Sequence, residues 1–188
     1  MKHIIGSLHR AVLLIYYARE DILRGASGWQ MFSRLDAPGF GILSQEAPDK
    51  RFMLYWLYYY FNRHLGEWAL ATDGVAPFYQ PRQEADRALL GGPLTPALAT
   101  LSKDEREIYL VIANGSWTRP VPCRIGLRNF DVGGAAGVLL TNDHLDGSPL
   151  LDRKEDAIMN LPVAKEAGGV TCTLPAHAVV FLTLQRSK

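Results

Sequence analysis

The amino-acid sequence predicts a mostly β protein, in which an antiparallel β-sandwich follows an N-terminal α/β piece made of helix, strand and helix. Two observations support this fold class. Before residue 66, apolar residues recur at a helical period in two stretches; after it, short apolar stretches alternate with turn residues. The pattern changes at Gly66, where an aromatic helix ends and a strand begins. We therefore expect two parts, residues 1–66 and residues 67–188.

The first predicted element is a helix at residues 7–24. Leu8, Val12 and further apolar residues follow a period of about 3.6, and Gly25 is a natural end for the helix. The hydroxyl of Ser7 is expected to cap the first turn. Because apolar residues extend beyond one stripe, we expect this helix to be covered on more than one side.

A strand at residues 29–36 and a short extended piece at residues 40–44 come next. The strand lies between Gly28 and Pro38, and its mixed apolar pattern suits a strand that is packed on both faces. The extended piece leads into a loop that ends at Pro48.

A second helix is predicted at residues 49–65. Asp49 follows Pro48, and its carboxylate suits both the cap position and the positive end of the helix dipole. Aromatic and apolar residues leave this helix almost no polar face, so it is buried or covers a partner. Met53 and the aromatic stripe also allow a cofactor or sugar platform, but core packing is the preferred interpretation.

After Gly66 the sequence predicts a strand at residues 67–72 and a long loop at 73–93, with a turn of helix at 84–90. Turn-rich segments then separate short strands, and apolar residues alternate most clearly at positions 121, 123, 125 and 127. Strands at this spacing are typical of a β-sandwich. The predicted strands cover residues 97–102, 107–114, 121–129, 137–141, 157–161, 169–174 and 178–185.

Composition narrows the classes of partner. The formal net charge is +1, and Arg124 and Arg128 on one strand face do not make the basic surface that nucleic acid requires. The longest apolar run, residues 11–18, is far shorter than the roughly 20 residues of a membrane-spanning helix. No signal peptide is visible at the start of this chain. We expect a soluble protein that binds neither nucleic acid nor membrane, and its compartment stays open.

The two cysteines, Cys123 and Cys172, are expected on the apolar side of their strands. Two reduced core thiols are the preferred interpretation, and a disulfide across the sandwich is the alternative. The five histidines have no metal-ligand spacing, so we expect no metal and no cofactor. The sequence Asn-Gly-Ser at 114–116 fits an N-glycosylation site, but it fits a turn better.

The order of these elements resembles a retaining glycoside hydrolase of the arabinofuranosidase and xylosidase type, in which a (β/α)8 barrel precedes a C-terminal β-sandwich. The segments FGIL at 40–43, FNRHLG at 61–66 and LPAH at 174–177 resemble the end of such a barrel and the turn before the last sandwich strand. The resemblance implies that residues 7–24 correspond to the seventh barrel helix, 29–36 to the eighth strand and 49–65 to the eighth helix.

This resemblance implies where the catalytic groups lie. Retaining glycosidases use two carboxyl groups about 5 to 5.5 Å apart, one as acid/base and one as nucleophile. In this family they follow barrel strand four and end strand seven, which places both upstream of Met1. We therefore expect the C-terminal portion of a glycoside hydrolase that acts on plant-type polysaccharide or oligosaccharide, with its accessory sandwich intact.

A self-sufficient small glycosidase is one alternative. Asp36 ends the strand that resembles the eighth barrel strand, and Glu46 lies in the following loop, so these two are the candidate catalytic carboxylates. An inverting pair would be separated by about 6.5 to 9.5 Å. Trp29, Gln30 and Phe32 are the candidate substrate-binding residues of this site. The simpler interpretation of both carboxylates is that they are solvated loop residues.

A non-catalytic carbohydrate-binding module is the other alternative. Trp117, after the Asn-Gly turn, and Trp68, at the boundary between the two parts, are its candidate platforms.

A helix–strand–helix remnant also leaves apolar faces and a sheet edge uncovered. We therefore expect either a homo-oligomer or a missing N-terminal catalytic part to cover them.

Overall fold

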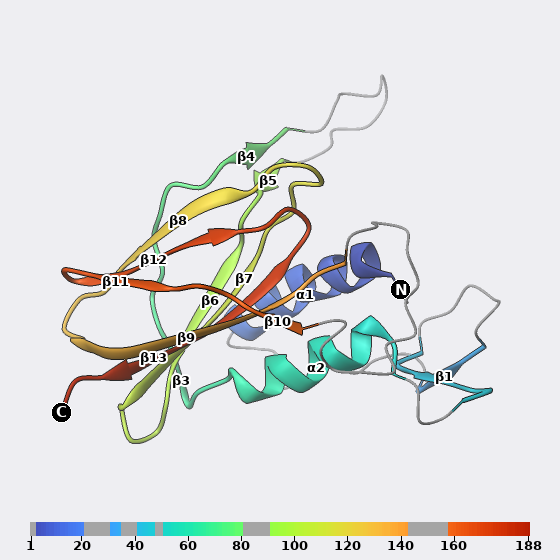
Figure 1. Ribbon diagram of the computed structural model, residues 1–188, viewed down its shortest axis with the longest axis horizontal. Helices are drawn as coiled ribbons and strands as arrows, with labels where there is room; N and C mark the ends of the chain where they lie inside the picture. The colour runs from blue at the N-terminus through green and yellow to red at the C-terminus, as the bar shows by residue number, and fades with distance from the viewer. Residues whose placement is uncertain (1–2, 21–30, 35–40, 48–50, 81–90, 143–157) are drawn as a thin grey trace.

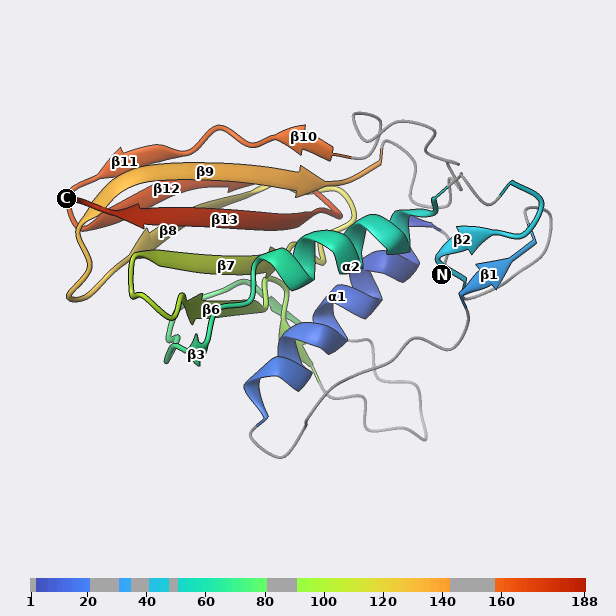
Figure 2. The same ribbon diagram turned by 90° about the horizontal axis from the view of Figure 1, so that it is seen from below.

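The computed structural model describes residues 3–20, 31–34, 41–47, 51–80, 91–142 and 158–188 (Figure 1). Within this part, two helices lie against one face of a six-stranded sheet, and a three-stranded sheet covers the opposite face (Figures 1 and 2). Both of these sheets are antiparallel, and all of their strands follow Gly66. The predicted fold class, a β-sandwich after an N-terminal α/β piece, is confirmed.

The six-stranded sheet has the order β10-β9-β13-β7-β6-β3, and the three-stranded sheet has the order β11-β12-β8. The strands of the larger sheet are β3 (Trp68–Ala69), β6 (Ala97–Leu101), β7 (Glu107–Ala113), β9 (Val132–Leu140), β10 (Ile158–Asn160) and β13 (Val179–Arg186). Those of the smaller sheet are β8 (Val121–Gly126), β11 (Ala164–Glu166) and β12 (Gly169–Leu174). A separate two-stranded pair joins β4 (Phe78–Tyr79) to β5 (Gly92–Pro93).

Strand β13 belongs to both layers of the core. Val179 and Phe181 face the helices, whereas Val180, Leu182 and Leu184 face the three-stranded sheet. Side chains alternate between the two faces of a strand, so a strand buried on both faces must be apolar at nearly every position. This explains why the sequence from 178 to 184 is an almost unbroken apolar run.

The helices are shorter than the sequence predicts, and the first one begins earlier. Helix α1 covers Ile4–Arg19 and helix α2 covers Met53–Arg63. The prediction that Ser7 caps α1 is wrong: Ser7 is fully buried inside the helix, and His3 occupies the cap position without a side-chain capping hydrogen bond. The predicted cap of α2, Asp49, lies outside the described residues, and Phe52 is at the observed N-cap. Neither observed N-cap has a side-chain capping hydrogen bond, and the first helical residues, Ile4 and Met53, are fully buried.

Several other boundaries differ from the predictions or lie outside the described part of the chain. The strand predicted at 29–36 is seen only as β1 (Phe32–Ser33), which pairs in parallel with β2 (Leu43–Ser44). Strand β9 begins at Val132, five residues before the strand predicted at 137–141, because Gly133 lets the chain pass close to the end of β13. Strand β11 lies between the strands predicted at 157–161 and 169–174, where no strand was predicted. The turn of helix predicted at 84–90 falls outside the described residues.

Gly66 lies between α2 and β3, the first strand of the sandwich. Its N–H donates to the Thr100 hydroxyl at 2.8 Å, and an added Cβ would lie 2.2 Å from the Leu101 carbonyl oxygen. Just before it, the Nδ1–H of His64 donates to the Tyr60 carbonyl at 2.8 Å. Burial lowers the pKa of His64 below its ordinary value. The division at residue 66 stays a prediction, since a single buried cluster joins both helices to the six-stranded sheet.

Candidate functional site

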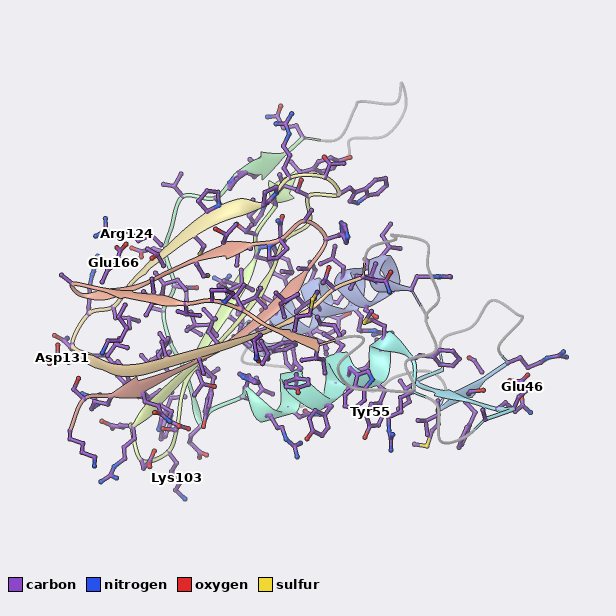
Figure 3. All side chains as sticks on the ribbon, viewed as in Figure 1. Glu46, Tyr55, Lys103, Arg124, Asp131 and Glu166 are labelled. Atoms are coloured by element: carbon purple, nitrogen blue, oxygen red, sulfur yellow. The ribbon has the colours of Figure 1, made fainter. Side chains whose placement is uncertain are left out.

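The predicted site residues fall into two separate regions of the molecule. Phe32 and Glu46 belong to the β1–β2 segment, which projects at the far right of Figure 3, where Glu46 is labelled. Trp117 lies in the loop between β7 and β8, on the sandwich. Trp29, Gln30 and Asp36 lie outside the described residues. The structure therefore brings Phe32 and Glu46 into one segment and separates Trp117 from them.

Glu46 is tied to its own loop. Its Oε1 lies 3.7 Å from the Nε of Arg34, and the Ser44 hydroxyl donates to its Oε2 at 3.3 Å. The same Ser44 hydroxyl accepts a hydrogen bond from the N–H of Ala47 at 3.0 Å. Because the Glu46 side chain is 41% exposed, this is the geometry of a surface ion pair that orders a turn. A catalytic role for Glu46 stays a prediction.

The two short strands of this segment are held together by a close backbone approach. The N–H of Gly41 donates to the Ser33 hydroxyl at 2.7 Å, and an added Cβ on Gly41 would lie 2.5 Å from the carbonyl carbon of Phe32. The Phe32 ring is 47% exposed. An exposed ring on an ordered strand can stack on the apolar face of a sugar, so the predicted subsite role of Phe32 stays a prediction.

The loop that carries Trp117 is built on a buried asparagine. The Asn114 amide nitrogen donates to the carbonyl oxygens of Arg119, Leu174 and Pro175, at 3.0, 3.2 and 2.8 Å. Its amide oxygen accepts the N–H of Ser116 at 3.0 Å. Asn114 is fully buried, so its side chain shapes the turn and has no room for a glycan. The turn interpretation of this motif is the correct one.

His177 fixes the same loop from the other side. Its backbone N–H donates to the Ser116 carbonyl at 2.7 Å, and its ring nitrogens lie 3.0 Å from the Trp117 carbonyl and 2.8 Å from the Asn142 carbonyl. With a φ of 41°, His177 adopts a left-handed backbone conformation that residues other than glycine seldom adopt. Strain of this kind is found where the surrounding structure fixes the residue. The Trp117 loop is thus ordered by contacts from residues 174–177.

Two further exposed aromatic side chains lie at this end of the sandwich. Backbone hydrogen bonds run from Leu94 to Pro77 at 2.7 Å and from Gly115 to Leu94 at 2.7 Å, which places β4 beside β5 and β5 beside the Trp117 loop (Figure 1). The side chains of Phe78, Tyr79 and Trp117 are 60%, 57% and 60% exposed. We call these three residues the aromatic end.

Phe78 and Tyr79 were not among the predicted site residues. Their only signal in the sequence is an aromatic pair between two prolines in a loop, which does not show what lies next to the pair. Trp68, the other predicted platform, is 56% exposed but pairs with Leu101, at the opposite end of β6 from Leu94. Trp68 and Trp117 therefore do not form one surface.

The described residues offer no other chemistry at these places. No three His, Cys, Asp or Glu side chains in the described part of the chain gather as a metal site. Neither described helix has the length and hydropathy needed to cross a membrane.

The structure was compared with known proteins. No protein-family model matches the sequence, and no curated protein matches it. The family 51 α-L-arabinofuranosidase of Bifidobacterium longum is 20% identical with a TM-score of 0.76, over 97% of this chain and 35% of that one. The family 30 subfamily 8 xylanase of Clostridium acetobutylicum is 12% identical with a TM-score of 0.67, over 98% and 40%. The catalytic domain of a family 30 xylanase from Talaromyces cellulolyticus gives 14% and 0.62, over 95% and 35%.

The fold is that of the C-terminal part of these glycoside hydrolases. This agrees with the resemblance seen in the sequence. The match includes the N-terminal helices as well as the sandwich, because it extends over nearly the whole chain. The chain spans only 35% to 40% of the length of these three solved structures. Identities of 12% to 20% establish the fold alone.

Proposed function

We propose that this chain is the C-terminal portion of a glycoside hydrolase that acts on plant-type polysaccharide or oligosaccharide, with the β-sandwich as its accessory domain. The observation that carries the proposal is the match of 97% of the chain, at a TM-score of 0.76, to about a third of an arabinofuranosidase. That enzyme is an α-L-arabinofuranosidase, and the other two enzymes are xylanases. All three activities concern pentose-containing glycans, which supports the proposed substrate class.

In this proposal the bond-breaking carboxylates belong to the part of the enzyme that this chain does not span. A retaining mechanism needs two carboxyl groups about 5 to 5.5 Å apart, held in place before the substrate arrives. Glu46, the one predicted catalytic carboxylate in the described part of the chain, is half-exposed and paired with Arg34. These features support a structural role for Glu46 and an external catalytic pair.

The helices provide the surface through which the remainder of the enzyme is contacted. One side of α1 packs against α2 and the six-stranded sheet, while Ile5, Tyr16 and Tyr17 are 37%, 39% and 39% exposed. Half-exposed apolar side chains on a helix of this kind suit a barrel packed beside it. A homo-oligomer is the other way to cover this face. Light scattering across a range of protein concentrations separates the two, because only self-association raises the mass with concentration.

Hydrolysis assays test where the catalytic carboxylates lie. The purified chain is incubated with chromogenic arabinofuranosides, xylosides and glucosides, beside Glu46→Gln and Asp36→Asn variants. We expect all three proteins to give the rate of buffer alone. Turnover by the wild type that disappears in either variant would establish the self-sufficient glycosidase and overturn this part of the proposal.

A non-catalytic carbohydrate-binding role is the second candidate, and the aromatic end favours it. Each exposed aromatic ring that stacks on a sugar adds to affinity, and the rigid loop around Trp117 limits the entropy lost on binding. We expect the chain to bind soluble arabinoxylan in affinity electrophoresis. Trp117→Ala should weaken this binding at least several-fold, and Trp117→Phe should retain most of it.

Matched controls distinguish binding at the aromatic end from non-specific binding. Trp68→Ala removes an equally exposed indole from the other end of the sandwich and should leave the affinity unchanged. His177→Ala removes the ring that contacts the Trp117 carbonyl and should weaken binding without touching the sugar. Equal affinities for wild type and Trp117→Ala would remove the aromatic end as a binding site.

A further inference from the structure

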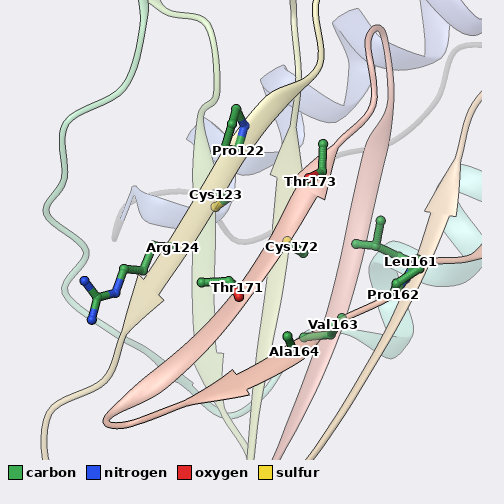
Figure 4. A pocket seen from close by; sticks show the side chains of 10 residues that line it. All are labelled: Pro122, Cys123, Arg124, Leu161, Pro162, Val163, Ala164, Thr171, Cys172 and Thr173. Carbon is green, nitrogen blue, oxygen red and sulfur yellow. The ribbon is translucent and has the colours of Figure 1, made fainter.

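The two cysteines of the chain lie directly opposite each other on neighbouring strands. Cys123 on β8 is paired with Cys172 on β12 in an antiparallel register that runs unbroken from Gly169–Gly126 to Leu174–Val121. Figure 4 shows them side by side on these two strands. Both are free thiols, and because they belong to one sheet they cannot form the disulfide across the sandwich that the sequence left open.

This register suits a disulfide bond. Directly opposed residues of antiparallel strands have Cα atoms about 4.5 to 5.5 Å apart and side chains on the same face of the sheet. Disulfides join residues whose Cα atoms are about 4.4 to 6.8 Å apart. The two sulfur atoms can therefore be joined without moving either strand by more than side-chain rotation and small backbone adjustment.

The Cys123 thiol is the more accessible of the two. Both cysteines line an open cavity of about 710 Å³ between β8, β12 and the segment that leads into β11 (Figure 4). Arg124, Thr171 and Thr173 contribute polar groups to the lining, and Leu161 and Val163 contribute apolar ones. Cys172 is buried, whereas Cys123 is only partly buried. A small disulfide compound can reach Cys123 through such a space.

The two sulfur atoms are not equivalent. The Cys172 thiol donates a hydrogen bond to the Cys123 sulfur, and this bond lowers the pKa of Cys123 and raises that of Cys172. The thiolate is the nucleophile in thiol–disulfide exchange. Cys123 is thus both the more accessible and the more easily ionised of the pair, and Cys172 is placed to react second.

We propose that Cys123 and Cys172 form a reversible cross-strand disulfide, closed by exchange with a low-molecular-weight disulfide such as glutathione disulfide. The Cys123 thiolate attacks one sulfur of the disulfide, forms a mixed disulfide and releases one thiolate, which takes up the proton that Cys123 lost. The Cys172 thiol then loses its proton, and its sulfur attacks the Sγ of Cys123. This step forms the Cys123–Cys172 bond and releases the second thiol. Two electrons pass from the protein to the small disulfide, which leaves as two thiol molecules.

The bond would fasten the three-stranded sheet. Strand β8 contacts β12 within that sheet, and residues 124–171 separate the two cysteines in sequence. The disulfide would therefore connect the two ends of this segment. It would lie in the three-stranded sheet, on the side of the sandwich away from the helices. A thiol reductant reverses the reaction by the same two exchange steps.

Mass spectrometry in glutathione redox buffers tests the proposal. Purified protein is equilibrated at ratios from fully reduced to fully oxidised, quenched in acid, denatured and treated with a maleimide. We expect the oxidised wild type to take up no maleimide and to carry no glutathione, and dithiothreitol should restore both thiols. Two maleimide-reactive thiols at the most oxidising ratio, or a lasting glutathione adduct on the wild type, would overturn the proposal.

Two variants test the order of the steps. Cys172→Ser keeps the attacking thiol without its partner and should accumulate glutathione on Cys123. Cys123→Ser should react at least tenfold more slowly, because its remaining thiol is buried. Equal rates for the two variants would refute the assignment of Cys123 as the attacking group. Oxidation of the wild type only in denaturant would show that the folded protein does not support the reaction.

Discussion

Replacing Phe181 by alanine removes the ring through which strand β13 contacts helix α2. The side chain is 1% exposed, and its ring centroid lies 5.6 Å from that of Tyr60 and 5.2 Å from that of His64. It therefore joins the last strand of the sandwich to the end of the second helix. If the helices and the sandwich unfold as one unit, this substitution must destabilise both.

The cost follows from burial and packing. Truncation of a fully buried phenylalanine to alanine destabilises a protein by about 3 to 5 kcal/mol, which combines lost burial with the cavity left behind. Domains of this size have a total stability of about 5 to 15 kcal/mol. We expect Phe181→Ala to lose about 4 kcal/mol, which lowers Tm by roughly 10 °C for a chain of this length.

Urea unfolding followed by tryptophan fluorescence and by circular dichroism at 222 nm measures the effect. The matched control is Leu182→Ala, which removes a fully buried side chain from the opposite face of the same strand. Both variants should show one transition by both probes, shifted to lower urea. A Phe181→Ala protein whose helical signal melts separately, or whose stability falls by less than about 1 kcal/mol, would refute a joint core.

Three further predictions concern Gly66, His64 and the pair Cys123–Cys172. Gly66→Ala places a Cβ 2.2 Å from the Leu101 carbonyl oxygen, so we expect a loss of about 1 to 3 kcal/mol in urea unfolding, and an unchanged stability would contradict the close approach. Burial lowers the folded-state pKa of His64 below its unfolded value of 6.5, so the unfolded chain binds the proton more readily. The resulting stability is present above pH 6.5 and is lost as the pH falls from there toward the folded pKa, by at most about 1.4 kcal/mol per pH unit. His64→Asn should flatten this dependence in unfolding curves across pH, and an equally steep dependence in that variant would contradict the assignment. Oxidation of the cysteine pair closes a loop of about 50 residues, for which the chain-entropy relation gives ~4 kcal/mol of added stability. Calorimetry should therefore show a higher Tm for the oxidised protein than for the reduced protein. Identical Tm values would contradict this stabilisation.

The sandwich was predictable from sequence because its strands alternate with strong turn signals. The predictions at 97–102 and 107–114 differ from β6 and β7 by a single residue at the C-terminal end. The start of β9 was not predictable, since Gly133 and Gly134 read as a turn until the partner strand is known. Only the register with β13 shows that these glycines permit a close approach between strands.

The candidate sites were less accessible to sequence reasoning, for a physical reason. The sequence does not show whether an aromatic residue is exposed or buried. The aromatic pair Phe78-Tyr79 therefore gave no sign of a site until β5 placed it beside the Trp117 loop. The pairing of Cys123 with Cys172 likewise depends on register, which periodicity alone does not fix. By contrast, the likeness to glycoside hydrolases came from the order of elements, and the fold comparison agrees with it.

The coding DNA upstream of the Met1 codon tests the central proposal most directly. If this chain is the C-terminal portion of a glycoside hydrolase, the same frame should continue upstream through seven barrel strands. It should also encode a carboxylate after strand four and another at the end of strand seven. An in-frame stop codon directly before Met1, with no barrel sequence beyond it, would contradict the proposal.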